Sequence, residues 1–199
     1  MMRSKFFILI LLLSACTFGK KNKLQNRAFI YSENIKKVQP FFKVYNDSKT
    51  SSTLYYKIKT TDFLSVYSAS EKQNKISYTL IGNLFLQGED FTVDSFSISK
   101  NIATDTIADT IEKIRLQTED GEKYILKISV TDNHKISTTN HSIHIDKSKT
   151  NKDDYLVFNN GNQLQFSNYF NINDTLVIKN NSHQKSLFIK YYNEYFPLA

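Results

Sequence analysis

Apolar and polar residues alternate with a period of two over most of the chain after Pro40. In the run "LYYKIK", Leu54, Tyr56 and Ile58 lie on one side of the alternation, and "KYILKISV" repeats the pattern. Because successive side chains of a strand point to opposite faces, these runs predict strands with one buried face. No segment shows a sustained helical period bounded by caps, and β-branched and aromatic residues are frequent. The chain is therefore predicted to be all-β.

The first part of the chain is predicted to form a sandwich of seven strands. Their expected ranges are 41–46, 53–60, 75–86, 91–99, 110–117, 122–131 and 135–146. Seven short strands over roughly 105 residues is typical of an immunoglobulin-like or fibronectin type III β-sandwich. We therefore expect a β-sandwich domain over residues 40–147.

The sequence "EDGE" at residues 119–122 lies between two apolar alternations. It predicts a hairpin between the strands on either side, because Asp-Gly tolerates the positive φ angles of a tight turn. Tyr124 follows this turn and begins the next strand, as does the tyrosine corner of immunoglobulin-like sandwiches. The sequence thus predicts a hairpin and, close to it, a tyrosine corner.

Two further positions predict irregularities in strands. Gly82 lies inside the expected strand 75–86, where it favours a bulge or a bend. In the expected strand 135–146, Ile136 has the opposite parity to the later isoleucines. This change of parity predicts one extra residue near Asn140.

A polar linker follows Lys147 and leads to a second, smaller β domain over residues 152–199. Its predicted strands are 155–158, 163–166, 175–180 and 186–192, with Asn160-Gly161 as the turn between the first two. About 48 residues is near the lower limit for an independent core without a disulfide or a metal. This unit therefore either packs on the first sandwich or requires sequence that is missing. The aromatic ending "YYNEYFPLA" favours the second alternative.

The first sixteen residues have the order of a secretory signal. Arg3 and Lys5 precede an unbroken apolar run, 6–13, which is too short to span a bilayer as a helix. The following Leu-Ser-Ala-Cys resembles a bacterial lipobox. That resemblance implies cleavage after Ala15 and acylation of Cys16. The alternative is a free or buried cysteine after an ordinary signal peptide.

Acylation of Cys16 would leave residues 16–39 as a polar tether between the lipid and the sandwich. Several acyl chains attach a protein stably to a membrane without a spanning helix. Removal of residues 1–15 takes away two basic residues and no acid, so the formal charge falls from +7 to +5. Cys16 is the one cysteine, so no disulfide is expected. Because Thr17 and basic residues follow it, we expect an outer-membrane lipoprotein that faces the periplasm.

The order of segments resembles the N-terminal half of the bacterial GWxTD-domain lipoproteins. The resemblance rests on the lipobox cysteine, "FFKVYNDSKTSSTLYYKIKTTDFL", "KISYTL", "YILKISVTD", "YLVF" and "IKYYNEYFPLA". It implies a β-sandwich ahead of a C-terminal domain with the Gly-Trp-x-Thr-Asp motif. This chain departs from the family because it has no tryptophan, and no Gly-Trp precedes Thr61-Asp62. The resemblance therefore implies a short form or a fragment, and no site residues can be transferred.

Residues that carry catalysis or bind metals are few. The histidines are His134, His141, His144 and His183. His141 and His144 are three residues apart, which places them on opposite faces of a strand, and we expect the histidines to be exposed and not to bind metal. The candidate calcium-binding acids are Asp105, Asp109, Glu119 and Asp120, which lack the EF-hand spacing and are interpreted as solvated turn residues. No catalytic residue, metal, cofactor or enzymatic activity is predicted.

Aromatic residues are the remaining candidates for a binding surface. The expected partner-binding residues are Tyr191, Tyr192, Tyr195 and Phe196, and a wider set adds Tyr55, Tyr67, Tyr169 and Phe170. Exposed tyrosines are frequent in protein interfaces, while the alternative is packing between the two β units. The lysines are scattered and do not form one stripe, so nucleic acid is not an expected partner. The sequence predicts no particular oligomeric state.

Together these features predict a lipid-anchored, non-catalytic protein of the cell envelope. Its β-sandwich domains would bind an envelope protein or act as a structural scaffold. One alternative is a module that binds glycan or peptidoglycan. Another is a truncated part of a larger envelope protein, whose activity lies in a missing C-terminal domain.

Overall fold

The computed structural model describes residues 37–104, 110–149, 151–159, 162–167, 170 and 173–181. All of them belong to one compact unit, Lys37–Ala199. These residues form ten strands and two short 3-10 helices, η3 (Thr60–Asp62) and η4 (Lys152–Asp154), so the prediction of an all-β chain is confirmed. Within the described ranges, no helix is long and apolar enough to cross a membrane.

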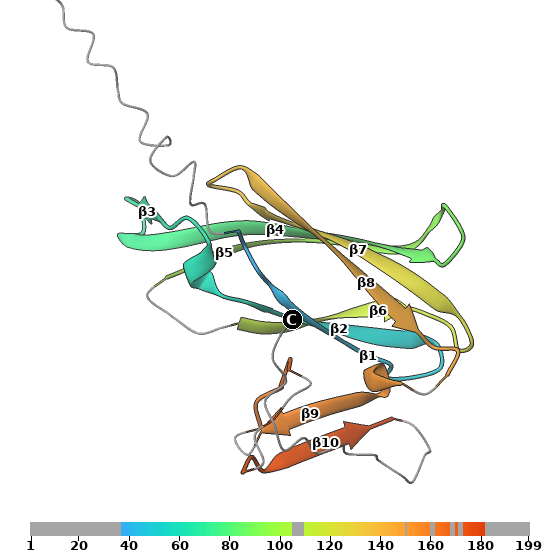
Figure 1. The fold of residues 1–199 in the computed structure, drawn as a ribbon. Helices are drawn as coiled ribbons and strands as arrows, with labels where there is room; N and C mark the ends of the chain where they lie inside the picture. Colours follow the sequence, from blue (N-terminus) through green and yellow to red (C-terminus); the bar gives the residue numbers. More distant parts are fainter. Residues whose placement is uncertain are drawn as a thin grey trace, which may run out of the picture. The chain divides into compact units, whose positions relative to one another are not determined.

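Two antiparallel sheets form a β-sandwich (Figure 1). The three-stranded sheet has the order β1-β2-β6 and contains β1 (Phe41–Tyr45), β2 (Ser51–Ile58) and β6 (Thr110–Gln117). In the five-stranded sheet, β4 pairs with β3, β5 and β7, and β7 pairs with β8. Its strands are β3 (Val66–Ser68), β4 (Gln73–Leu86), β5 (Thr92–Ala103), β7 (Lys123–Asp132) and β8 (Ser137–Asp146). The β2–β6 and β4–β7–β8 pairings are those of the predicted immunoglobulin-like sandwich.

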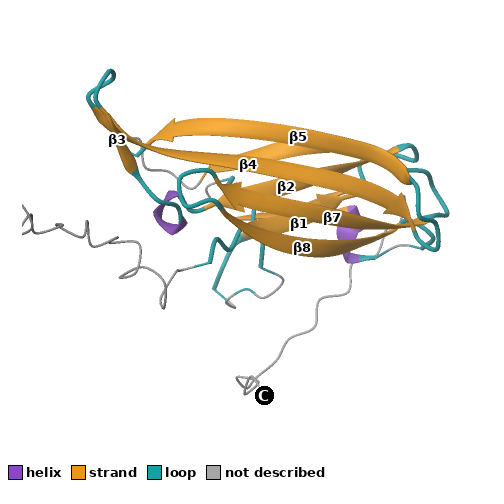
Figure 2. Cartoon of the chain, turned by 90° about the horizontal axis from the view of Figure 1, so that it is seen from above, coloured by secondary structure: helices purple, strands orange, loops and turns teal. Residues whose placement is uncertain are grey.

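The inner faces of the two sheets enclose one hydrophobic core. Figure 2 shows the larger sheet lying over β1 and β2. The alternating residues of β2, β4 and β7 are fully buried, and they include Leu54, Tyr56, Ile76, Tyr78, Leu80, Leu84, Leu126, Ile128 and Val130. Burial of each large apolar side chain stabilises the fold by about 1.5–3 kcal/mol. Alternation along the sequence thus identified both the strands and their inner faces, although it did not predict the short strand β3.

The predicted hairpin at residues 119–122 is wrong. β6 pairs with β2 and β7 pairs with β4, so this segment crosses from one sheet to the other. Gly121 does adopt a positive φ of 87°. The hydroxyl oxygen of Tyr124 accepts a hydrogen bond of 2.8 Å from the Glu119 backbone N–H. This bond closes the corner between the sheets, which confirms the predicted tyrosine corner.

Tyr124→Phe should lower the free energy of unfolding by about 1 kcal/mol, because it removes the acceptor of a partly buried N–H group without changing the packing of the ring. Urea denaturation followed by far-ultraviolet circular dichroism measures this change. The matched control is Tyr67→Phe, at a tyrosine that is 60% exposed on β3. Equal stabilities for the two variants would show that the corner bond contributes nothing.

Gly82 is not the site of a bulge, because β4 continues through it and pairs it with Phe96 of β5. A Cβ atom on Gly82 would lie 2.2 Å from Cζ of Phe96, so the ring occupies the space above the glycine. The register shift lies instead between Leu84 and Phe85 of β4. Their partners on β5 are Asp94 and Thr92, which makes Val93 the extra residue.

The extra residue predicted near Asn140 is also absent. β7 and β8 pair without a register shift from Lys123–Asp146 to Asp132–Ser137. Ile136 belongs to the turn before β8, where it has a φ of 55° and is 89% exposed. Its parity therefore carries no information about the faces of β8.

The second β unit contains β9 (Tyr155–Asn159) and β10 (Leu176–Asn180), which pair antiparallel. The predicted strand 163–166 is only a single bridge between Phe158 and Leu164, supported by adjacent backbone hydrogen bonds. The predicted turn Asn160-Gly161 and the predicted strand 186–192 lie outside the described residues.

The described part of this unit packs on the outer face of the three-stranded sheet. A second hydrophobic cluster contains Tyr45, Leu156 and Leu164, with Tyr55, Ile111, Phe158 and Phe166 packed against it. Asn46 connects the two parts by hydrogen bonds. Its backbone N–H donates to the Asp153 carbonyl (2.7 Å), and its Nδ2 donates to Oδ1 of Asp154 (2.9 Å). Its own carbonyl accepts from Nδ2 of Asn181 (2.9 Å).

Candidate functional site

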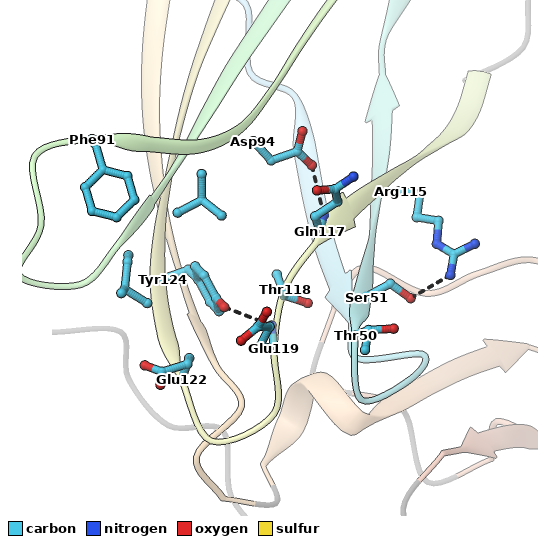
Figure 3. A pocket seen from close by; sticks show the side chains of 12 residues that line it. Thr50, Ser51, Phe91, Asp94, Arg115, Gln117, Thr118, Glu119, Glu122 and Tyr124 are labelled. Atoms are coloured by element: carbon cyan, nitrogen blue, oxygen red, sulfur yellow. Dashed lines mark hydrogen bonds between the residues drawn. The ribbon is translucent and has the colours of Figure 1, made fainter.

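An open cleft of about 840 Å³ lies at one end of the sandwich, between the edge strands β5 and β6 (Figure 3). The residues that line it include Phe91, Val93, Asp94, Arg115, Glu119 and Glu122. They come from the β4–β5 connection, β5, β6 and the corner that precedes β7. The cleft thus joins parts of both sheets.

One wall of the cleft is apolar. Phe91 is 59% exposed and Val93 is 37% exposed, and Leu86 and the ring of Tyr124 complete this wall. The bulge in β5 explains why consecutive residues line the cleft, because an extra residue changes the direction of the side chains around it. As a result, both Val93 and Asp94 line the cleft.

The opposite wall is polar and held by hydrogen bonds. Oδ2 of Asp94 accepts from the Gln117 backbone N–H (2.8 Å), which links the edges of β5 and β6 (Figure 3). Nη2 of Arg115 donates to Oγ of Ser51 (3.2 Å). Farther along the same two strands, Nζ of Lys100 lies 3.1 Å from Oε1 of Glu112. The edges are therefore linked at two places, and the cleft lies beside the first link.

The polar wall has a second layer of support around Asp47. Ser51 and Thr53 donate hydrogen bonds of 2.5 Å and 2.7 Å to its two carboxylate oxygens. Burial acts to raise the pKa of Asp47, but these hydrogen bonds and the Arg115 charge hold that pKa below its usual value. The carboxylate therefore stays charged near neutral pH and fixes the hydroxyl that Arg115 contacts.

Beneath the cleft, the buried ammonium of Lys147 holds two loops together. Nζ donates to the carbonyls of Ser48 (2.8 Å) and Lys49 (3.0 Å) and to Oγ1 of Thr118 (3.1 Å). The carbonyl of Ser51 also lies within reach at 3.3 Å. Burial lowers the pKa of Lys147, while nearby aspartates act in the opposite direction. Because Ser51 and Thr118 line the cleft, Lys147 positions its base.

The edge of β6 is poorly suited to pairing with another strand. Gln117 directs its N–H away from β2, so the alternation of an antiparallel ladder directs the same backbone groups of Lys113 and Arg115 outward. The Gln117 N–H is already bonded to Asp94, and charged residues along an edge oppose strand addition. The cleft is therefore suited to contacts through side chains and not to extension of the sheet.

The structure gives different outcomes for the aromatic candidates. Tyr67 is exposed on β3, whereas Tyr55 is half-buried and packs in the cluster beneath the second β unit. Phe170 is half-buried. The candidates Tyr169, Tyr191, Tyr192, Tyr195 and Phe196 lie outside the described residues, as do Ala15 and Cys16. The available signal for the cleft was Phe91, an apolar residue directly after the polar turn "QGED".

The expectation of exposed histidines is wrong for His141. It is half-buried, because it lies on the inner face of β8 with Ile143 and Ile145. Its ring packs edge-on against the ring of Phe42, with 5.3 Å between the two ring centroids. Burial lowers its pKa. His144 is exposed, in agreement with the predicted opposite faces. Among the described residues, no group of three or more His, Cys, Asp or Glu side chains is placed to hold a metal ion.

Comparisons with known proteins leave the family of this chain undefined. No family model matches it, and no curated protein matches it. A solved structure assigned as a β-galactosidase of Bacteroides fragilis is similar over 53% of this chain, with 16% sequence identity and a TM-score of 0.33. The chain spans 16% of the length of that protein.

Proposed function

We propose that this chain is a lipid-anchored, non-catalytic binding module of the cell envelope that holds a segment of a partner protein in the cleft between β5 and β6. The observation that carries the proposal is the composition of the cleft. An exposed apolar wall around Phe91 and Val93 faces a polar wall that is fixed by internal hydrogen bonds.

This composition matches the anatomy of protein interfaces. Aromatic residues and arginine are enriched at their centres, and an anchor in a desolvated pocket contributes a large share of the binding energy. Phe91 and Arg115 supply these residue types on opposite walls of the cleft. Glu119 and Glu122 at the corner would favour a partner segment that carries a positive charge beside its apolar residues.

The proposed lipid anchor at Cys16 would attach the module to the membrane. Residues 17–36 would reach at most about 70 Å when fully extended, at about 3.5 Å per residue. Such a tether allows the cleft to meet partners well away from the membrane surface. It also raises the effective concentration of the module toward other proteins of the same membrane.

A photo-crosslinking amino acid at position 91 tests this proposal in the full chain, produced in living bacterial cells. We expect a defined crosslinked species that contains one envelope protein. Val93→Asp should reduce its yield about tenfold, because it replaces about 1.5 kcal/mol of apolar burial at the same wall with a charge.

The matched control places the same amino acid at position 67. Tyr67 is an aromatic residue of nearly equal exposure, 60% against 59% for Phe91, on a different strand. A crosslinked species that is identical at both positions, or unaffected by Val93→Asp, would refute the cleft as the binding site. Absence of any crosslinked protein at position 91 would refute the proposed partner.

A further inference from the structure

A second pocket, of about 430 Å³, lies where the second β unit meets the outer face of the three-stranded sheet. It shares no lining residue with the cleft between β5 and β6. Its lining residues are Phe41, Lys57, Lys59 and the segment 163–167. This lining contains two lysines and no acid, whereas the cleft contains acids of the corner.

The ring of Phe41 holds the ammonium group of Lys59 in place. The rings of Phe41 and Phe166 have centroids 6.3 Å apart and are inclined at 57°. Nζ of Lys59 lies 5.2 Å from the centroid of the Phe41 ring. This cation–π contact positions an ammonium group that its flexible side chain would otherwise leave mobile. Phe41 is nevertheless 43% exposed, so an apolar surface remains open beside the charge.

The segment 163–167 adds neutral polar groups. Gln163, Gln165 and Ser167 supply two carboxamides and a hydroxyl. Nε2 of Gln165 donates to the Gln163 carbonyl (3.1 Å), which fixes the orientation of this carboxamide. A carboxamide both donates and accepts hydrogen bonds, as the hydroxyl groups of a sugar require.

We infer that this pocket binds a carboxylate-bearing sugar residue of an acidic polysaccharide. The lysine ammonium groups would meet the carboxylate, the carboxamides would meet the ring hydroxyls, and the exposed phenyl surface would meet the C–H face of the sugar ring. A neutral sugar would bring no carboxylate to the ammonium group of Lys59 beside the Phe41 ring. An apolar peptide would bring no hydroxyl groups to the carboxamides of Gln163 and Gln165.

Polygalacturonate is the probe, and its fully methyl-esterified form is the uncharged control. Isothermal titration of the full chain should show binding of the acid form and at least tenfold weaker binding of the ester. Lys59→Gln and Phe41→Ala should each weaken binding of the acid form about tenfold. Lys59 is exposed, so its substitution should leave the thermal unfolding curve unchanged.

The matched variants are Lys113→Gln, which removes an exposed lysine from β6, and Phe91→Ala in the cleft. Both should bind polygalacturonate as the unmodified chain does. Equal effects of Lys59→Gln and Lys113→Gln would overturn the proposal, because they would indicate attraction by net charge alone. Equal binding of the acid and the ester would also overturn it.

Vesicles that contain phosphatidylglycerol form the last arm of the test. Binding to these vesicles that is lost in Lys59→Gln, together with no binding of polygalacturonate, would assign the pocket to a lipid headgroup and overturn the sugar proposal. The site is independent of the proposed partner-binding cleft. Position 91 crosslinking and polygalacturonate binding can therefore fail separately.

Discussion

Lys147→Met should lower the free energy of unfolding by about 3 kcal/mol, the largest loss that we expect from a single substitution. Methionine fills much of the same space but donates no hydrogen bond. The carbonyls of Ser48 and Lys49 and the hydroxyl of Thr118 would lose their buried donor. Urea denaturation followed by circular dichroism at neutral pH measures the change.

Lys49→Met is the matched control, because this neighbouring lysine is exposed and contributes only its backbone carbonyl to the Lys147 ammonium. Its effect should stay within about 0.5 kcal/mol. Lys147→Met should also weaken crosslinking at position 91, since Lys147 positions the base of the cleft. A loss of stability below 1 kcal/mol would mean that solvent replaces the ammonium, contrary to its 7% exposure.

Asp153→Asn should raise the free energy of unfolding at pH 7 by about 2 kcal/mol. Asp153 is 7% exposed beneath the second β unit, and burial raises its pKa to about 6, against the opposing charges of Lys152 and Lys43. The folded protein therefore binds a proton that the unfolded chain has already released between pH 3.8 and about 6. The contribution of Asp153 protonation to the free energy of unfolding is fully present below pH 3.8 and is lost as the pH rises through about 6.

The asparagine variant lacks this loss, so the two proteins should have similar stabilities at pH 3.5 and differ most above pH 6. The backbone bond from the Asp153 N–H to Oδ1 of Asn151 (2.7 Å) is retained in the variant. Asp90→Asn removes the same charge from an exposed position and should show no such dependence. A difference between Asp153→Asn and the unmodified chain that is constant with pH would contradict the buried-acid explanation.

Alternation along the sequence was sufficient to place most strands and their inner faces, because β4 and β7 bury every second residue along most of their length. It was not sufficient to identify the partner of each strand. The segment 119–122 has the composition of a hairpin turn, yet β6 pairs with β2 across more than fifty residues. Local pattern carries no information on such distant pairing, and the structure places the turn at a corner between the sheets.

The buried polar residues escaped prediction for a related reason. Lys147 and Asn46 have ordinary polar neighbours in the sequence, and their partners come from loops about a hundred residues away. The cleft was missed because Val93 owes its position to a bulge in β5, whereas the sequence predicted a bulge at Gly82. Position 82 is a glycine for a different reason: the ring of Phe96 fills the space that a side chain would occupy.

Three hydrogen bonds join Asn46 to the second β unit, and they bear on the order in which the chain folds. The strands β4 and β5, like β7 and β8, are joined by short loops and can pair as soon as they are synthesised. Asn46, in contrast, accepts a hydrogen bond from Asn181, which lies 135 residues later in the chain. Closure of so long a loop is slow. The aromatic outer face of β1 and β2 stays uncovered during that interval. We therefore expect association between partly folded chains to begin at this face before the second β unit covers it.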